Sequence, residues 1–165
     1  MITFLIIYII GAAACAYHIY QLPVYERTQA KIIELLMLYQ LIFYVGITSF
    51  LAFIGLTFLE DQVAMNTRWP TSPFEQELAN VNFAYGVLGI LSIWFRKLFW
   101  FAIVVGFSIW ILGDAIHHQY DAYINHNYSD GNIGALFYTD LIIPILLIIN
   151  MYFYIKTTPG VLTNK

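Results

Sequence analysis

The chain has 165 residues, of which 61% are hydrophobic and only 10% are charged, and its mean hydropathy is +0.72. Soluble domains carry about 25% charged residues, so this composition excludes an ordinary soluble protein and favours an integral membrane protein with the lipid bilayer as its main partner. The net charge of −3 says little by itself, because most acidic residues lie on the connections expected outside, where they form no nucleic-acid-binding surface, and we expect no nucleic-acid partner. The single cysteine, Cys15, excludes an intramolecular disulfide. At this length we expect one transmembrane domain over residues 1–165.

Five apolar stretches follow one another along the chain, and each is long enough to cross a bilayer. A helix of about 20 residues at 1.5 Å per residue spans the hydrocarbon core. The predicted transmembrane helices cover residues 2–20, 32–59, 78–95, 98–117 and 135–155. The expected fold class is therefore all-α, a polytopic membrane helix bundle with five transmembrane helices.

The connections between these helices differ in length and polarity. Residues 60–76 contain Trp-Pro-Thr-Ser-Pro, whose prolines break a helix, so we expect a re-entrant or surface-lying loop there. The link at Arg96 and Lys97 is very short, which predicts a tight antiparallel hairpin of the third and fourth helices. Small residues favour a close contact within that hairpin: Gly86, Gly89 and Gly106. Residues 118–134 are polar and aromatic, with an Asp-Gly-Asn turn signal near their end.

The basic residues predict the orientation of the bundle. Alternate connections hold six of the seven, and Lys/Arg excess marks the cytoplasmic side of short loops. These six are Arg27, Lys31, Arg96, Lys97, Lys156 and Lys165. Arg68 alone lies in a connection on the other side. The N-terminus is therefore expected outside and the C-terminus inside.

Ionisable and amide side chains from three predicted helices fall at the same depth. They lie at the start of the third helix, at the end of the fourth and near the start of the fifth, and all three of these ends face the outside. Polar side chains within a span are costly and are functional candidates by default. We therefore predict a ligand-binding site in the outer leaflet, formed by Glu77, Asn82, Asp114, His117, His118 and Asp140.

Four members of this set suit a divalent metal ion: Asp114, His117, His118 and Asp140. The first three are spaced i, i+3, i+4, so they can share one helix face. Carboxylates and imidazoles are ligands for zinc, iron or manganese. Two simpler interpretations stay open. The histidines can simply lie at the water-exposed end of a helix, and the carboxylates can form structural hydrogen bonds between helices.

A set of short motifs resembles a family of small, uncharacterised bacterial integral membrane proteins. The motifs lie within residues 51–147: Ser72-Pro73-Phe74 with Glu77 and Asn82, Gly86-Val87-Leu88-Gly89, Gly106-Phe107-Ser108-Ile109 with Gly113, Asn127, Asn132-Ile133-Gly134, and Asp140 with Pro144. The resemblance implies a five-helix protein of the bacterial cytoplasmic (inner) membrane and supplies no activity. The chain departs from the pattern at Glu75, where the family usually has Gln, and at His117-His118, where it usually has one His.

Three classes of function stay open at this point. In the first, the outer-leaflet site binds a metal ion or a small polar ligand. In the second, a homo-oligomer acts as a transporter or channel, although polar groups confined to one leaflet speak against a pore. In the third, the chain is a structural or assembly subunit whose polar groups join helices. Whether it is an enzyme is also open, since a carboxylate and a histidine can act as base and acid on a lipid or quinone headgroup, but no motif selects that reaction.

Overall fold

A computed structural model describes residues 2–162, and all of the regular secondary structure in that range is helical. The elements in chain order are α1 (Ile2–Gln21), the 3₁₀-helix η1 (Val24–Glu26), α2 (Gln29–Tyr39), the π-helix η2 (Gln40–Ile47), α3 (Thr48–Phe58), α4 (Glu60–Thr67), α5 (Phe74–Leu91), α6 (Leu98–Ile124), α7 (Asp130–Ile133) and α8 (Ala135–Thr157). The predicted all-α class is confirmed.

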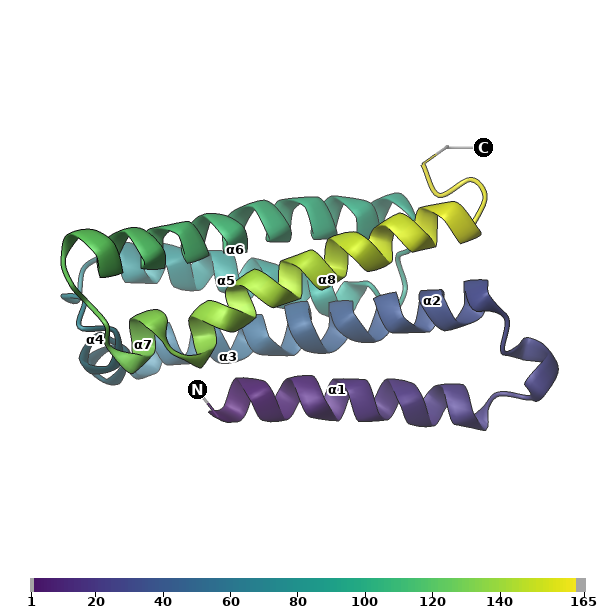
Figure 1. The fold of residues 1–165 in the computed structure, drawn as a ribbon, viewed down its shortest axis with the longest axis horizontal. Helices are drawn as coiled ribbons and strands as arrows, with labels where there is room; N and C mark the ends of the chain where they lie inside the picture. Colours follow the sequence, from purple (N-terminus) through teal and green to yellow (C-terminus); the bar gives the residue numbers. More distant parts are fainter. Residues whose placement is uncertain (1, 163–165) are drawn as a thin grey trace.

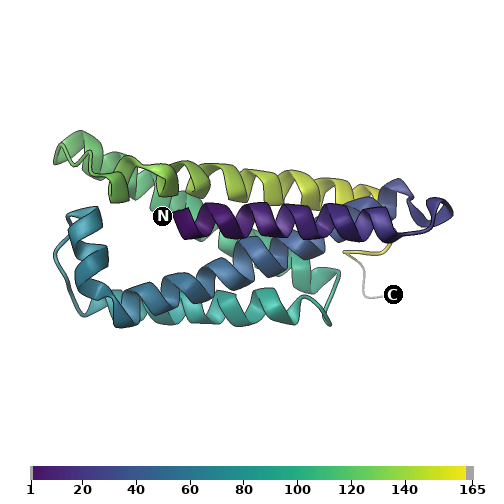
Figure 2. The ribbon, with the colours of Figure 1, turned by 90° about the horizontal axis from the view of Figure 1, so that it is seen from below.

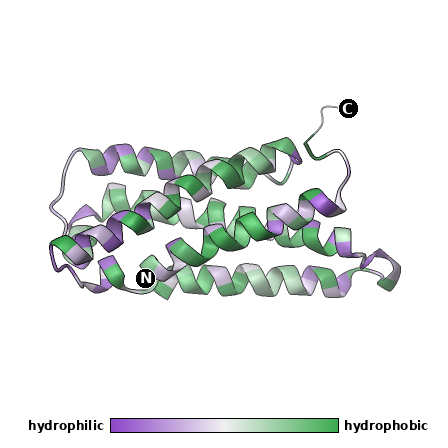
Figure 3. Ribbon diagram, turned by 45° about the horizontal axis from the view of Figure 1, so that its top comes forward, coloured by the Kyte–Doolittle hydropathy of each residue, from purple (hydrophilic) through white to green (hydrophobic). Residues whose placement is uncertain are grey.

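Four helical segments are long and apolar enough to cross a membrane: Ile2–Gln21, Gln29–Phe58, Leu98–Ile124 and Asp130–Thr157. Figure 3 shows hydrophobic residues along the helices and more hydrophilic ones towards the two ends of the bundle. The third predicted span corresponds to α5, which is not among these four and is less apolar, since it carries Glu75, Glu77, Gln76, Asn80 and Asn82.

The long helices run back and forth between two ends of an elongated bundle (Figure 1). The start of α1, α4, α7 and the start of α8 lie towards one end, and the ends of α1 and α8 lie towards the other (Figures 1 and 2). α3 packs along α5, α8 packs along both α6 and α2, and α1 packs against η2. The basic connections α1–α2 and α5–α6 therefore lie at the same end of the bundle as the last turn of α8 (Figure 1).

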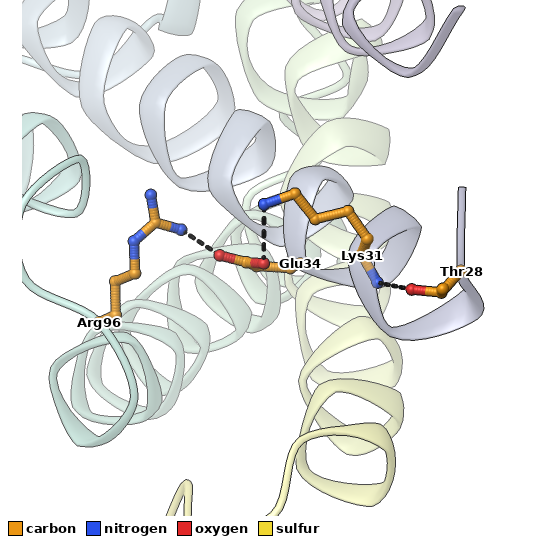
Figure 4. A network of polar contacts seen from close by, with 4 residues as sticks. All are labelled: Thr28, Lys31, Glu34 and Arg96. Atoms are coloured by element: carbon orange, nitrogen blue, oxygen red, sulfur yellow. Dashed lines mark hydrogen bonds and ion pairs between the residues drawn. The ribbon is translucent and has the colours of Figure 1, made fainter. Parts of the chain in front are cut away.

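An ion-pair network holds this basic end together (Figure 4). The Glu34 carboxylate accepts from Arg96 at 2.6 Å and from Lys31 at 3.2 Å, which ties α2 to the connection before α6. Thr28 caps α2 by accepting from the backbone N–H of Lys31 at 3.3 Å. The ion-paired side chains are about one-third exposed, so each pair stabilises the fold by about 1 kcal/mol or less.

The closely packed core occupies the basic half of the bundle. Its fully buried members come from α2, η2, α6 and α8: Met37, Leu41, Val45, Trp100 and Leu147. The Trp100 indole donates to the carbonyl of Ser92 at 2.9 Å, which fixes the start of α6 against the end of α5. The other half of the bundle is packed less completely, and the cavity described below lies there.

The antiparallel hairpin of the third and fourth helices is present, but it is not tight as predicted. α5 ends at Leu91 rather than at residue 95, so the connection to α6 is longer than Arg96 and Lys97 alone, and α5 shares only a small contact with α6. α5 packs instead on α3 and η2, where Gly89 meets the backbone of Gly46 with no room for a Cβ. Small residues at such a contact let two helix backbones approach closely.

Two connections contain more helix than expected. Residues 60–67 form α4 rather than part of a loop, and the prolines act only after Arg68, at Pro70 and Pro73. α6 continues to Ile124, seven residues beyond the predicted end of that span. One face of these last turns, with His118, Asp121 and Ala122, is buried against α7 and the Trp69 segment, while the other face is exposed.

Candidate functional site

A cavity of about 280 Å³ lies in the half of the bundle opposite the basic end. Residues of α1, α3, α5, α6 and α8 form its walls, with Trp69 and α7 at the same end. Most of the lining side chains are apolar. The polar ones include Glu75, Asn82, Asp114, His118, Thr139 and Asp140.

Three of the predicted ligand residues converge on this cavity. The cluster contains one ligand atom from each of Asp114, His118 and Asp140, and these three atoms lie within 4.8 Å of one another. His118 Nε2 lies 3.8 Å from Asp114 Oδ2, and these two residues are one turn apart on α6. Asp140 comes from α8, so the cluster joins two helices that are distant in sequence.

Asn132 on α7 determines which nitrogen of His118 faces the cluster. The Asn132 amide nitrogen lies 2.6 Å from the carbonyl of Asn127 and 3.3 Å from that of His118, and only an N–H can satisfy these two acceptors. The Asn132 oxygen therefore faces His118 Nδ1, 2.7 Å away, and Nδ1 carries the proton. In the neutral imidazole, Nε2 then presents its lone pair to Asp114 and Asp140. A carbonyl that holds the outer nitrogen in this way is the usual support of a metal-ligating histidine.

A polar cap covers the imidazole; we use this name for Thr67, Trp69, Asp121, Asn127 and Ser129. The Trp69 ring stacks on His118 with centroids 4.8 Å apart and planes 17° apart. Its indole donates to Asp121 at 2.8 Å, and Asn127 donates to the same carboxylate oxygen at 2.7 Å. Asn127 and Ser129 also donate to the Thr67 carbonyl, which joins the end of α4 to the segment before α7. The cap thus fixes the ring plane of His118.

Of the other predicted site residues, Asn82 lines the cavity, whereas Glu77 and His117 do not. Asn82 is buried and lines the cavity, with Glu75 and Leu78 on the same helix face at spacings i, i+3 and i+7. That register turns Glu77 towards the outside, where it is exposed and does not line the cavity. His117 is also exposed, with its ring edge against Trp69 at 5.3 Å.

Several residues of the site were missed by sequence reasoning. Glu75 lines the cavity, yet the helix was expected to start only at residue 78. Asp121 continues the Asp114 and His118 face by another turn, at i+7 from Asp114, but it fell beyond the expected end of the fourth span. The heptad spacing was a usable signal for Asp121, whereas no local pattern marks the contact of Trp69 with His118.

The cluster has the donor set of a divalent metal site. A tetrahedral ion with ligands at 2.0–2.1 Å places its ligand atoms about 3.3 Å apart, so the three side chains need to close by less than about 1.5 Å. Two carboxylates this close in a mostly apolar cavity repel one another unless a cation or a shared proton lies between them. Carboxylate and imidazole together suit Zn²⁺, Fe²⁺ or Mn²⁺.

The geometry and composition define the chain as an all-helical protein whose long helices are compatible with a membrane, with a carboxylate–histidine cluster at one end. Residues 1–159 match a family described as "Family of unknown function (DUF6790)", and the chain belongs to that family. Neither the curated proteins nor the solved structures contain a significant match to it.

Proposed function

We propose that this protein is an integral membrane protein that binds a divalent metal ion through Asp114, His118 and Asp140. The observation that carries the proposal is the convergence of two carboxylates on an imidazole whose Nε2 lone pair is directed at them by Asn132. The polar cap holds that ring in one plane, which lowers the entropy lost when an ion binds. A water molecule or a ligand in the cavity completes the coordination.

We further propose that the chain crosses the membrane five times, with the cluster in the extracytoplasmic leaflet of a bacterial cytoplasmic membrane. Two features support this topology. α5 connects the two ends of the bundle as the four apolar segments do (Figure 1), and the basic residues lie mainly at the end opposite the cluster, with Arg68 as the exception. The first turns of α5, which are too polar for the hydrocarbon core, then lie at the outer interface.

Zinc binding to purified protein tests the metal site. In detergent, after treatment with EDTA, the wild-type chain is expected to bind one Zn²⁺ by equilibrium dialysis. His118→Gln, Asp114→Asn and Asp140→Asn each remove one charge or donor and are expected to abolish or weaken binding by about 10–100-fold. His117→Gln is the matched control, because it changes the neighbouring exposed histidine. The proposal would be wrong if the His118→Gln variant bound Zn²⁺ with wild-type affinity, or if the His118→Gln and His117→Gln variants lost zinc affinity to the same extent.

A further inference from the structure

Glu75 presents an unsatisfied acceptor to the cavity. Its Oε2 atom is completely buried, and it accepts no hydrogen bond from any residue in the range 2–162. The residue lines the cavity from the first turn of α5. An unpaired buried carboxylate oxygen costs more than an ordinary lost hydrogen bond, so its position calls for a donor that comes from outside the chain.

Asn82 adds a second acceptor on the same face of α5. Its side chain is 7% exposed, and its amide nitrogen donates to the Leu78 carbonyl at 3.0 Å. Its amide oxygen has no donor in the part of the chain that the structure describes. The α5 wall therefore offers two acceptors to whatever occupies the cavity, besides the second N–H of the Asn82 amide.

The rest of the lining selects a positively charged, apolar ligand. The residues around the cavity include three carboxylates, from Glu75, Asp114 and Asp140, and none of the described ones is Lys or Arg. Aromatic rings also line it: Phe4, Tyr8, Tyr44, Trp69, Phe107 and Trp110. Aromatic faces attract cations as well as apolar groups, whereas an anionic headgroup finds no basic partner here.

We propose that the cavity binds a small apolar molecule with a protonated amine, whose ammonium group donates to Glu75 and Asn82 while its apolar part contacts the aromatic walls. This deepens the proposed function by adding an organic ligand beside the metal site, and the ammonium group contacts Glu75 and Asn82 rather than the three proposed metal ligands. The volume of about 280 Å³ is at the lower end of ligand pockets, which span about 300–1,000 Å³, so the ligand is an alkyl- or arylamine rather than a two-chain lipid.

Binding of three matched probes tests the inference. Phenethylamine, 2-phenylethanol and phenylacetate share a ring and differ in charge, and their binding is measured by saturation-transfer NMR on the full chain in phosphatidylcholine nanodiscs. Phenethylamine is expected to bind saturably and the other two weakly. Glu75→Gln is expected to weaken amine binding by about 10–100-fold, the loss of one charged hydrogen bond, while Glu77→Gln, the exposed neighbour, leaves it unchanged. The inference would be overturned if 2-phenylethanol bound as tightly as phenethylamine, or if the Glu75→Gln variant bound phenethylamine with wild-type affinity.

Two further arms separate this inference from its alternatives. Competition by phosphatidylethanolamine added to the nanodiscs would overturn the assignment to a small free amine and give the amine to a lipid headgroup, whereas no competition supports the free amine. Zinc binding by Glu75→Gln is expected to match wild type. If the wild-type protein binds no zinc but binds phenethylamine in a way that depends on Glu75, the metal site is wrong and this inference stands. If it binds zinc but shows no Glu75-dependent binding of phenethylamine, only this inference is wrong.

Discussion

Asn132 combines three contacts in one fully buried side chain on α7. Two of them, to the carbonyls of Asn127 and His118, fix the orientation of its amide, and the third acts on His118 Nδ1. A residue that touches neither carboxylate of the cluster thereby sets the protonation of the histidine that faces them. The two contacts with His118 also join the short helix α7 to the end of α6.

Replacing Asn132 is expected to weaken metal binding without removing a ligand. Asn132→Ala frees the His118 ring to rotate or to change tautomer, and loss of such a supporting contact lowers metal affinity by about 10–100-fold. Equilibrium dialysis with Zn²⁺ measures the change. Asn125→Ala is the control, because Asn125 is exposed and donates to Asp121 rather than to His118. Equal zinc affinity in the Asn132 variant and the wild type would contradict the tautomer argument.

At the scale of elements, the contact of α5 with η2 positions the face of α5 that lines the cavity. The backbones of Gly89 and Gly46 are in contact, and a Cβ on Gly89 would also meet the carbonyl oxygen of Leu41. The π-helical turns of η2 widen the helix at this level. α5 is thereby held against η2 and α3, with its Glu75 and Asn82 face towards the cavity.

A methyl group at this contact is expected to loosen the bundle. Gly89→Ala forces the backbones of α5 and η2 apart and should destabilise the fold by about 1–3 kcal/mol, seen as a lower melting temperature in detergent. Gly113→Ala on α6 is the matched variant, because nothing lies within 4 Å of the added Cβ and alanine favours a helix over glycine by about 1 kcal/mol. Equal melting temperatures for the two variants would show that the contact is not tight.

The elements also show what the sequence could predict. Hydropathy identified all four long apolar segments, because each needs only its own composition to be recognised. The register of α5 was not accessible in this way, since Pro73 and Phe74 start the helix earlier than its apolar run does, and this changes which of Glu75 and Glu77 faces inwards. The convergence of Asp114, His118 and Asp140 agrees with the depth argument, whereas the support from Trp69 and Asn132 depends on tertiary contacts that leave no local pattern.

For the whole molecule, the two ends of the bundle differ in chemistry. One end has the Glu34 network and the basic connections, and the other has the cavity, the cluster and the polar cap. A bilayer that follows the positive-inside rule places the basic end in the cytoplasm. In that proposed orientation, the proposed metal site is reached from the extracytoplasmic side or from the outer leaflet.

Cysteine labelling of intact cells tests this topology. In a Cys15→Ser background, Ser72→Cys and Lys97→Cys flank α5 at exposed positions. Ser72→Cys is expected to react with a membrane-impermeant maleimide in spheroplasts, and Lys97→Cys only after lysis. Labelling of both before lysis would mean that α5 does not cross the membrane, and the reversed pattern would mean that the bundle is inverted.

Bound metal should also stabilise the whole bundle, because the cluster joins α6 to α8. An ion that binds only the folded chain adds about 2.7 kcal/mol at a free concentration one hundred times its Kd. The melting temperature of wild type in detergent is expected to rise with Zn²⁺ and to fall again with excess EDTA, while Asp140→Asn shows neither change. A metal-independent melting temperature in wild type would contradict a site that links the two helices.

X-ray absorption at the zinc edge of the loaded protein tests the central claim most directly. The account predicts a first shell at about 2.0–2.1 Å that contains one imidazole nitrogen and carboxylate oxygens from Asp114 and Asp140, with the imidazole scattering absent in His118→Gln. A shell of oxygens alone in the wild type, or an unchanged spectrum in His118→Gln, would contradict it.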